Sequence, residues 1–476
     1  MRAVVVLAER AWVAVRQTRG RITLPWVLRF ARRRRRLLSS TRFVAVTGSC
    51  AKTTTKELVT AVLRARHPGV ANPGTANSLR WVANTILACR RTDRFVAMEL
   101  GSSGPGTLAP QAALLQPDIA VITNVGTDHH KAFGSLEATA REKSTVVRAL
   151  RPGGMAVLNA DDPNVLAMRE LAPGPVLLVG RSESADLRAE DVSSAWPDPL
   201  SFTAVYKGER VRIETRLHGE HWVTAVLSAL AVGVLLDVPL EEGARALAAV
   251  DPWTGRMQPV TTPAGVTFMC DDGKAPFWSF PATFDFLRQA RGARKVMVIG
   301  TVSDYPGDAK RRYKQLARQA LEVADEVVFA GPMSHNARGA AKQAGEERLH
   351  VFDTLQEAAR HLDDTLRAGD LVLLKGSNGA DHLRRLALTR THRVRCWRTH
   401  CDRLKFCDVC PLLSVPIAPR RAPRRAAHGA AHGDGSRGGA EHGRSSHGDV
   451  GAAAAPSHAR AGRATAAERG VGTPAG

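Results

Sequence analysis

The sequence predicts an α/β fold with a P-loop central domain built on a parallel sheet, then a Rossmann-like C-terminal domain, a small Cys-rich segment and a disordered tail. Short apolar runs rich in β-branched residues alternate with helical patterns in two successive series, as in parallel-sheet proteins. A chain of 476 residues also exceeds the usual size of one hydrophobic core. The predicted divisions are residues 1–41, 42–258, 259–391, 392–414 and 415–476.

The first series of strands and helices extends to about residue 255, and the second begins near residue 262. Pro and Gly interrupt the periodicity at 251–257, between the two series. The predicted strands are Arg42–Thr47, Phe95–Glu99, Ile119–Thr123 and Met155–Leu158 in the first series, and Val266–Cys270, Lys295–Ile299, Glu326–Phe329 and Leu371–Leu374 in the second. The clearest predicted helices are Thr53–Arg66 and His221–Leu236.

Both ends of the chain are basic. Residues 1–41 hold eleven Arg and one Glu (11 − 1 = +10), and residues 415–476 hold nine Arg and four acidic residues (9 − 4 = +5), out of a net charge of +22. The N-terminal segment is predicted to be a solvated basic helix or a helix lying on an anionic membrane surface. Its apolar run is too short to span a bilayer. The tail has almost no large apolar side chain and is expected to be disordered.

Charge and cysteine content limit the classes of function. The body between the two ends carries 22 − 15 = +7, which suits small anionic substrates such as nucleotides. Nucleic-acid binding is not expected, because the chain has only three Tyr and no base-stacking motif. Cys50, Cys89 and Cys270 are scattered and indicate reduced thiols in a cytoplasmic protein.

The most informative stretch is GSCAKTTT at residues 48–55, between the first strand and its helix. This is the context of a P-loop, whose N–H groups and helix N-terminus bind a polyphosphate. Lys52 is predicted to contact the β- and γ-phosphates of ATP, and Thr53 to offer its hydroxyl to Mg²⁺. Ala51 stands where such loops usually have a second glycine. The predicted ATP-binding residues of the loop are Gly48, Ser49, Cys50, Ala51, Lys52, Thr53 and Thr54.

Residues 42–390 resemble the Mur ligases, most closely the MurF branch. The motifs that carry the resemblance occur in one order: VTGSCAKTTTKEL at 46–58, ELG at 99–101, NVGTDH at 124–129, FGSLE at 133–137, AREK at 140–143, VLNADDP at 157–163, GRM at 255–257 and LKGS at 374–377. In this family ATP phosphorylates a carboxylate and an amine then displaces the phosphate. The resemblance therefore implies an ADP-forming acid–amino-acid ligase of cell-wall biogenesis. Its substrates would be a small-molecule carboxylate and an amino acid or dipeptide.

The resemblance also implies roles for single residues. Glu99 and His129 correspond to ligands of two Mg²⁺ ions, with His130 as the alternative in a shifted alignment. Lys143 corresponds to a lysine that is carbamoylated and supports the metal site. The implied residues are Lys52, His129 and Lys143 for catalysis, Thr53, Glu99 and His129 for metal, and Arg256, Asp271 and Asp272 for the nucleotide.

Two departures from the family pattern leave other functions open. MurF has a sizeable N-terminal domain that binds the uridine nucleotide, whereas only residues 1–41 precede the first predicted strand. Trp222 and Ala225 stand where the family has adenine-contacting Asn residues. The alternatives are a ligase acting outside peptidoglycan synthesis, on poly-γ-glutamate, folyl-glutamate or a specialised metabolite, and an ATP-binding scaffold that does not ligate.

Four cysteines follow the second series of strands. Their spacing, C-x4-C-x5-C-x2-C, offers the four thiolates that tetrahedral Zn²⁺ takes. Structural zinc is the prediction, an iron–sulfur cluster is the runner-up, and four reduced thiols are the third possibility. Truncation at about residue 414 is expected to leave activity intact. The four predicted ligands are Cys396, Cys401, Cys407 and Cys410.

Overall fold

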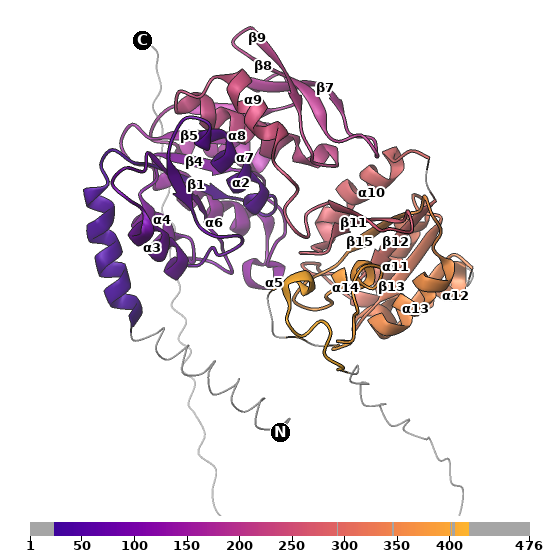
Figure 1. The fold of residues 1–476 in the computed structure, drawn as a ribbon. Coiled ribbons are helices and arrows are strands. Elements are labelled where there is room, and N and C mark those ends of the chain that lie inside the picture. Colours follow the sequence, from indigo (N-terminus) through magenta and orange to yellow (C-terminus); the bar gives the residue numbers. More distant parts are fainter. Residues whose placement is uncertain (1–22, 293, 345–346, 400, 402–404, 418–476) are drawn as a thin grey trace, which may run out of the picture. The chain divides into compact units, whose positions relative to one another are not determined.

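A computed structural model describes residues 23–292, 294–344, 347–399, 401 and 405–417. These residues form an α/β structure with two separate sheets (Figure 1), as predicted. The predictions for residues 1–22 and for the tail from residue 418 lie outside the described residues. Residues 23–37 are helical, in agreement with the helical prediction for the N-terminal segment.

The first sheet has nine strands in the order β2-β3-β1-β4-β5-β6-β7-β8-β9. β1 lies between β3 and β4 and pairs with both in parallel. Neighbours stay parallel as far as β7. The strands are β1 Arg42–Thr47, β2 Gly69–Ala71, β3 Phe95–Glu99, β4 Ile119–Ile122, β5 Met155–Asn159, β6 Val176–Gly180, β7 Leu187–Ser193, β8 Ser201–Tyr206 and β9 Glu209–Glu214.

The prediction that the whole first sheet is parallel was wrong for its last two strands. β8 pairs antiparallel with β7, and β9 pairs antiparallel with β8. Lys207 and Gly208 join β8 to β9 and have φ angles of 48° and 86°, the left-handed conformation of a tight hairpin turn. A two-residue turn leaves no room for the crossover helix that a parallel pair needs, so β8 and β9 can only be antiparallel.

Helices cover both faces of the first sheet. Successive side chains of β1 point to opposite faces of the sheet. Val44 and Val46 pack against α2, α8 and α9 in one core. Phe43 and Ala45 pack against α3, α6 and the helix at 23–37 in a second core. These helices and the shorter ones of this region are α2 Lys52–Arg64, α3 Leu79–Ala88, α4 Ala109–Leu115, α5 His130–Phe133, α6 Leu136–Arg148, α7 Pro163–Leu166, η1 Ala167–Leu171, η2 Glu220–Trp222, α8 Val223–Leu235 and α9 Leu240–Ala248.

The second sheet has the order β10-β11-β15-β12-β13-β14 and is parallel except for β10. Its strands are β10 Gln258–Thr261, β11 Thr267–Asp271, β12 Lys295–Ile299, β13 Glu326–Ala330, β14 Leu349–Phe352 and β15 Leu371–Lys375. Its helices are η3 Phe277–Ser279, α10 Phe280–Gln289, α11 Ala309–Leu321, η4 Ser334–Ala337, α12 Arg338–Ala344, α13 Leu355–Thr365 and α14 Arg384–Leu388. α10 and α11 pack on one face, and α13 and α14 on the other.

The Cys-rich segment follows α14, and its described residues include one short helix, η5 Cys407–Val409. It extends beyond its predicted end at residue 414, because Ile417 forms a parallel bridge with Cys396. Ile417 N donates to Arg395 O at 3.0 Å, and Trp397 N donates to Ile417 O at 2.7 Å. The last described residues therefore belong to this segment rather than to the tail.

Candidate active site

The P-loop follows β1 and leads into α2. Gly48 has a φ of 153°, and a Cβ on it would lie 1.9 Å from Thr123 Oγ1, so only glycine fits there. Ala51, at the usual glycine position, has a φ of 63°, which is a strained conformation for alanine. Lys52 Nζ donates to the carbonyl oxygens of Gly48 at 2.7 Å and Ser49 at 3.2 Å. The ammonium group is therefore held at the loop itself.

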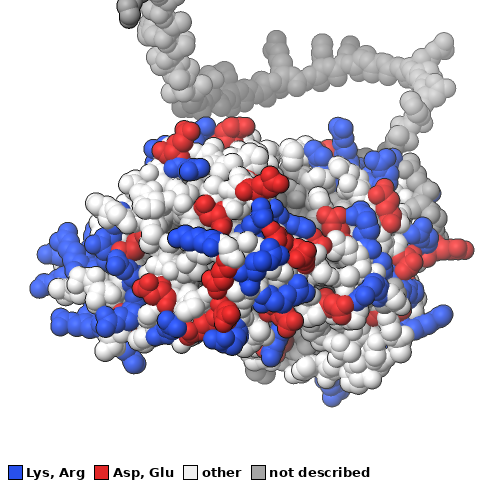
Figure 2. Space-filling model, turned by 90° about the horizontal axis from the view of Figure 1, so that it is seen from above, with Lys and Arg blue, Asp and Glu red and all other residues white. Residues whose placement is uncertain are grey.

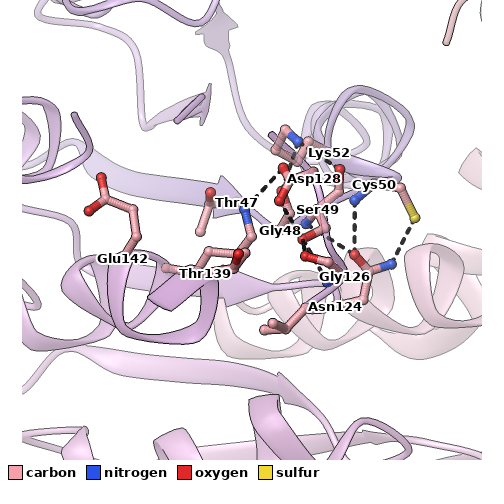
Figure 3. A network of polar contacts seen from close by, with 12 residues as sticks. Thr47, Gly48, Ser49, Cys50, Lys52, Asn124, Gly126, Asp128, Thr139 and Glu142 are labelled. Atoms are coloured by element: carbon pink, nitrogen blue, oxygen red, sulfur yellow. Dashed lines mark hydrogen bonds and ion pairs between the residues drawn. The ribbon is translucent and has the colours of Figure 1, made fainter. Parts of the chain in front are cut away.

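Asn124, from the loop after β4, fixes the first half of the P-loop (Figure 3). Its Oδ1 accepts from the N–H groups of Ser49 at 3.1 Å and Cys50 at 2.9 Å, and its Nδ2 donates to Cys50 Sγ at 2.8 Å. The N–H groups in the first turn of α2 have no acceptor within the helix. The Thr54 hydroxyl is buried without a hydrogen-bond partner in the described structure. The loop thus presents several donors of the kind that bind a polyphosphate.

Thr53 and Glu99 meet beside the loop. Thr53 Oγ1 donates to Glu99 Oε2 at 2.7 Å, and Asn77 Nδ2 donates to Glu99 Oε1 at 2.7 Å. The carboxylate is only 2% exposed. Glu99 ends β3, which pairs in parallel with β1, so the two strands end at the same edge of the sheet. A hydroxyl and a carboxylate side by side are oxygen donors of the kind that Mg²⁺ takes.

A buried ion pair lies next to the loop. Lys143 of α6 is fully buried, and its Nζ lies 3.4 Å from Asp128 Oδ2. Ser49 Oγ donates to Asp128 Oδ1 at 2.9 Å and accepts from Gly126 N at 2.7 Å, as Figure 3 shows. Burial, together with the charge of Lys52, lowers the pKa of the Lys143 ammonium to about 8, although Asp128 opposes the shift. Part of the Lys143 population is therefore neutral and nucleophilic near pH 8.

His129 follows Asp128 and precedes α5 with a φ of 49°. Its ring is half-buried, and burial lowers the pKa of the imidazole. The neutral ring is the form that ligates metals. His130, the alternative ligand, is the first residue of α5 and is also half-buried.

The two aspartates predicted to bind the nucleotide have different environments. Asp271 ends β11 and forms an ion pair with Lys375 at the end of β15. Asp272 is fully buried, and its Oδ1 lies 3.2 Å from Arg384 Nη2 in α14. Burial raises the pKa of the Asp272 carboxyl, against the pull of Arg384. Asp272 is thus held in the interior, and a ligand could reach it only if this pair opened.

Three further positions bear on the nucleotide. Arg256 packs against Gly273, where a Cβ would lie 1.9 Å from the Arg256 Nη1 atom. Trp222 and Ala225 are both buried in the core on the α8 face of the first sheet. Both positions that depart from the family pattern are therefore core positions with little exposed surface.

Three residues of the site were missed from the sequence: Asp128, Asn124 and Asn77. Asp128 and Asn124 follow β4, and polar residues after a strand next to the P-loop strand are a usable signal, because the strand ends meet there. Asn77 lies in the loop before α3, and no sequence pattern connects it with Glu99.

Two family descriptions match the chain: the Mur ligase middle domain over residues 46–233, and the Mur ligase glutamate ligase domain over residues 255–378. The UDP-N-acetylmuramoyl-tripeptide–D-alanyl-D-alanine ligase of Mycobacterium leprae is 33% identical over 366 residues, which cover 70% of this chain and 71% of the relative. The enzyme of the same name from Bacillus subtilis is 26% identical over 343 residues, which cover 71% of this chain and 74% of the relative.

Solved structures agree with these matches. A crystal structure of MurF from Acinetobacter baumannii has a TM-score of 0.69 and 26% identity, over 76% of this chain and 79% of that chain. MurF from Thermotoga maritima, in complex with ADP, has a TM-score of 0.64 and 21% identity, over 77% and 82%, and shares the fold. The fold predicted from the sequence is confirmed.

Proposed function

Because the chain belongs to the Mur ligase family, we propose that it is an ATP-dependent, ADP-forming ligase of the MurF type that joins a carboxylate to an amine through an acyl-phosphate. The observation that carries the proposal is the hydrogen bond between Thr53 and Glu99 at the first turn of the P-loop helix. This bond places two oxygen atoms that can bind a cation next to the loop, whose N–H groups can bind phosphate. The buried pair of Lys143 and Asp128 lies against the same loop.

The loop fits a triphosphate. The buried Thr54 hydroxyl lacks a partner in the described structure, and a phosphate oxygen would supply one. Lys52 can exchange its two carbonyl acceptors in the loop for phosphate oxygens, which bind an ammonium more strongly. When bound, ATP and Mg²⁺ supply the phosphoryl group and neutralise the charge that develops on it.

The residues present also fit the family's metal sites. Thr53 and Glu99 would hold one Mg²⁺ through oxygen atoms, and His129 would contribute to a second. Lys143 would support this second site as a carbamate: its neutral amine adds to the carbon of CO₂ and loses a proton, forming an N–C bond and a carboxylate. The lowered pKa of Lys143 makes the neutral amine available. A carbamate beside Asp128 puts two anions together, so a cation is required next to them.

For the nucleotide end of the site, we favour Asp271 and Arg256 over Asp272. Both aspartates are paired, Asp271 with Lys375 and Asp272 with Arg384. Asp272 is fully buried, whereas Asp271 keeps a small exposed fraction at the end of β11. The need for ATP favours the cytoplasm as the place of the reaction.

The substrates we propose are those in the names of the relatives: a UDP-N-acetylmuramoyl-tripeptide as the carboxylate and D-alanyl-D-alanine as the amine.

The test is phosphate release by the full chain with ATP and Mg²⁺, with both substrates together and with each alone. Release is expected only with both, and Lys52→Ala should abolish it. Release that needs a different carboxylate, such as a glutamyl chain or a folate, would move the protein outside peptidoglycan synthesis. No release with any pair would reject the ligase.

We also propose that the N-terminal helix contacts an anionic membrane surface. Trp26, Phe30 and Leu37 are 60%, 58% and 54% exposed. At about 100° per residue they fall within one narrow stripe of the helix. On the opposite side, Arg35 anchors the helix by donating to Leu115 O at 2.6 Å. Among the exposed arginines of this helix (Arg29, Arg32, Arg33 and Arg36), Arg33 lies next to the stripe and Arg29 and Arg36 lie to one side of it.

Apolar side chains flanked by arginines suit the interface of an anionic bilayer. Figure 2 shows Lys and Arg side chains gathered at the left edge, the side on which Figure 1 draws this helix. No helix in the described part of the chain has the length and apolarity to cross a bilayer. Sedimentation with phosphatidylglycerol vesicles should exceed that with phosphatidylcholine vesicles, and the double change Trp26→Ser and Phe30→Ser should weaken it. Equal binding to both kinds of vesicle would reject the contact.

A further inference from the structure

Beyond the proposed ligase activity, we propose that Cys396, Cys401, Cys407 and Cys410 bind one zinc ion, and that this site fixes the loop that carries Arg256. All four thiols line one small cavity together with His382 and Arg385. The four cysteines come from loops and from the start of η5, and all of them are free thiols. Nothing in the ligase chemistry uses them.

The cavity has room for a single ion. Its volume is about 20 Å³, which is room for one water-sized particle. A zinc ion fits such a space. The only three ligand atoms within 4.8 Å of one another in the described residues are those of Glu326, His350 and His361. Zinc binding therefore requires the thiols to draw closer together around the cavity.

The group formed by Glu326, His350 and His361 is a weaker candidate. Glu326 is already bound by the guanidinium of Arg294, which forms an ion pair with its Oε2 atom. A dication at this place would have to bind beside that positive charge. The cysteine cavity is also lined by cations (Arg385, Arg398 and Lys405), but it offers four ionisable thiols whose combined negative charge exceeds the charge of the ion.

Arg385 provides the electrostatic argument for the cysteine site. Its side chain is buried (2% exposed), and within the described residues its guanidinium donates to backbone carbonyls, among them those of Cys396 at 2.8 Å and Arg398 at 3.0 Å. No carboxylate forms a salt bridge with it in the described structure. A buried cation without a counter-charge is costly. Four thiolates and one Zn²⁺ carry a net charge of 4 − 2 = 2 negative units, which provides that counter-charge.

His382 is a positioning residue at the wall of the same cavity. Its Nδ1 lies 3.5 Å from Cys407 Sγ, and its Nε2 is buried without a hydrogen-bond partner in the described structure. If Nδ1 carries the hydrogen, this N–H group donates to the sulfur of a metal-bound Cys407 thiolate and orients it. His382 thus acts through Cys407 and leaves the four ligand positions to the cysteines.

The Cys-rich segment reaches the nucleotide end of the proposed active site through Phe406. A Cβ on Gly255 would lie 2.6 Å from Phe406 Cζ, so the ring packs directly on the turn that precedes Arg256. The guanidinium of Arg384, the partner of Asp272, lies 5.5 Å from the centre of the same ring. By binding Cys407 and Cys410, which follow Phe406 in the chain, the metal would hold the ring against the Gly255–Arg256 turn.

The bridge between Cys396 and Ile417 decides which C-terminal truncations retain zinc. Truncation at residue 414 removes Ile417, which bridges to Cys396, so it should lower the zinc content. A chain that ends at Ile417 keeps the bridge and should retain its zinc.

The test begins with the metal content of the full chain, purified under reducing conditions. About one zinc per chain is expected, and the double change Cys407→Ser and Cys410→Ser should abolish it. Cys89→Ala, outside the cluster, is the matched control and should retain zinc.

Because the double variant could fail to fold, the unaltered chain is also titrated with a thiol-reactive mercurial. Zinc should be released in step with the modification of the cluster thiols. Iron, no metal, or zinc that survives the double change would overturn the site.

The second part of the inference rests on the proposed function and has its own readout. Phe406→Ala should retain zinc but raise the KM for ATP by about fivefold, with little change in kcat. An unchanged KM with zinc in place would reject the link to the Gly255–Arg256 turn and leave the metal site standing. If the chain showed no ligase activity at all, ATP binding measured by calorimetry would replace the KM.

Discussion

Glu99 joins the P-loop helix to the neighbouring strand through Thr53, and its buried carboxylate has the clearest geometry for a metal ligand. Glu99→Gln keeps the size of the side chain and can still accept from Asn77, but it removes the charge, and its contact with Thr53 survives only with the hydroxyl as the acceptor. We expect kcat to fall by about 100-fold or more, because the cation at the transferred phosphoryl group is then poorly held. ATP binding without Mg²⁺ should change little. Phosphate release measures the first quantity and calorimetry the second, with the exposed Glu241→Gln as the control.

The proposed carbamoylation of Lys143 predicts that turnover depends on pH. The pKa of Lys143 is lowered to about 8, so the fraction of neutral amine increases as the pH rises through 8. At limiting bicarbonate, turnover should rise between about pH 7 and 9, and added bicarbonate should raise it most at the acidic end. Lys143→Arg should be inactive at every pH, since a guanidinium does not form the carbamate. Activity of this variant comparable to that of the exposed-site control Lys131→Arg would argue against carbamoylation.

Ala51 is strained in the left-handed region with a φ of 63°. Glycine adopts this conformation without the clash of a Cβ, although it loses more backbone entropy on folding. Ala51→Gly should therefore raise the free energy of unfolding of the central domain by up to about 1 kcal/mol, or roughly 2–4 °C in melting temperature. Thermal melting followed by circular dichroism measures this. A fall in melting temperature would mean that the alanine conformation is not strained.

At the scale of elements, α14 links the second sheet to the Cys-rich segment. Arg384 forms a buried pair with Asp272, and Arg385, the next residue, holds the carbonyls of the cysteine loops. Asp272→Ala leaves a buried guanidinium without its partner and should destabilise the C-terminal domain by about 3–5 kcal/mol. The exposed pair of Arg338 and Asp353 is the control, and Asp353→Ala should cost about 1 kcal/mol or less. Urea unfolding compares the two variants, and equal losses would contradict the account.

The strands that the sequence predicted are those with continuous apolar runs. Phe95–Glu99 and Lys295–Ile299 coincide with β3 and β12, because strands covered on both faces need apolar side chains at every position. β8 and β9 were missed for the opposite reason. β9 is the edge strand and β8 its neighbour, β9 alternates buried and exposed residues, and a two-residue turn joins the two strands. Such short alternating segments carry little periodic signal.

At the scale of the whole molecule, the site residues that could be predicted are those at strand ends next to the P-loop strand. Glu99 and the segment containing His129 lie there because β3 and β4 both pair with β1. The contacts that could not be predicted join residues far apart in sequence without a shared pattern. Asn77 to Glu99 and Lys143 to Asp128 are examples. The burial of Asp272 could not be predicted either, since the sequence does not indicate which of two adjacent aspartates is accessible to a ligand.

The measurement that tests the central claim most directly follows oxygen-18 from the carboxylate substrate into phosphate. In the proposed reaction a carboxylate oxygen attacks the γ-phosphorus, ADP leaves, and the amine then displaces a phosphate that retains that oxygen. With a carboxylate labelled at both oxygens, each phosphate released should carry one label atom, and the ligated product should form in equal amount. The Lys52→Ala variant should form neither. Unlabelled phosphate, formed by attack of water on ATP, would contradict ligation through an acyl-phosphate.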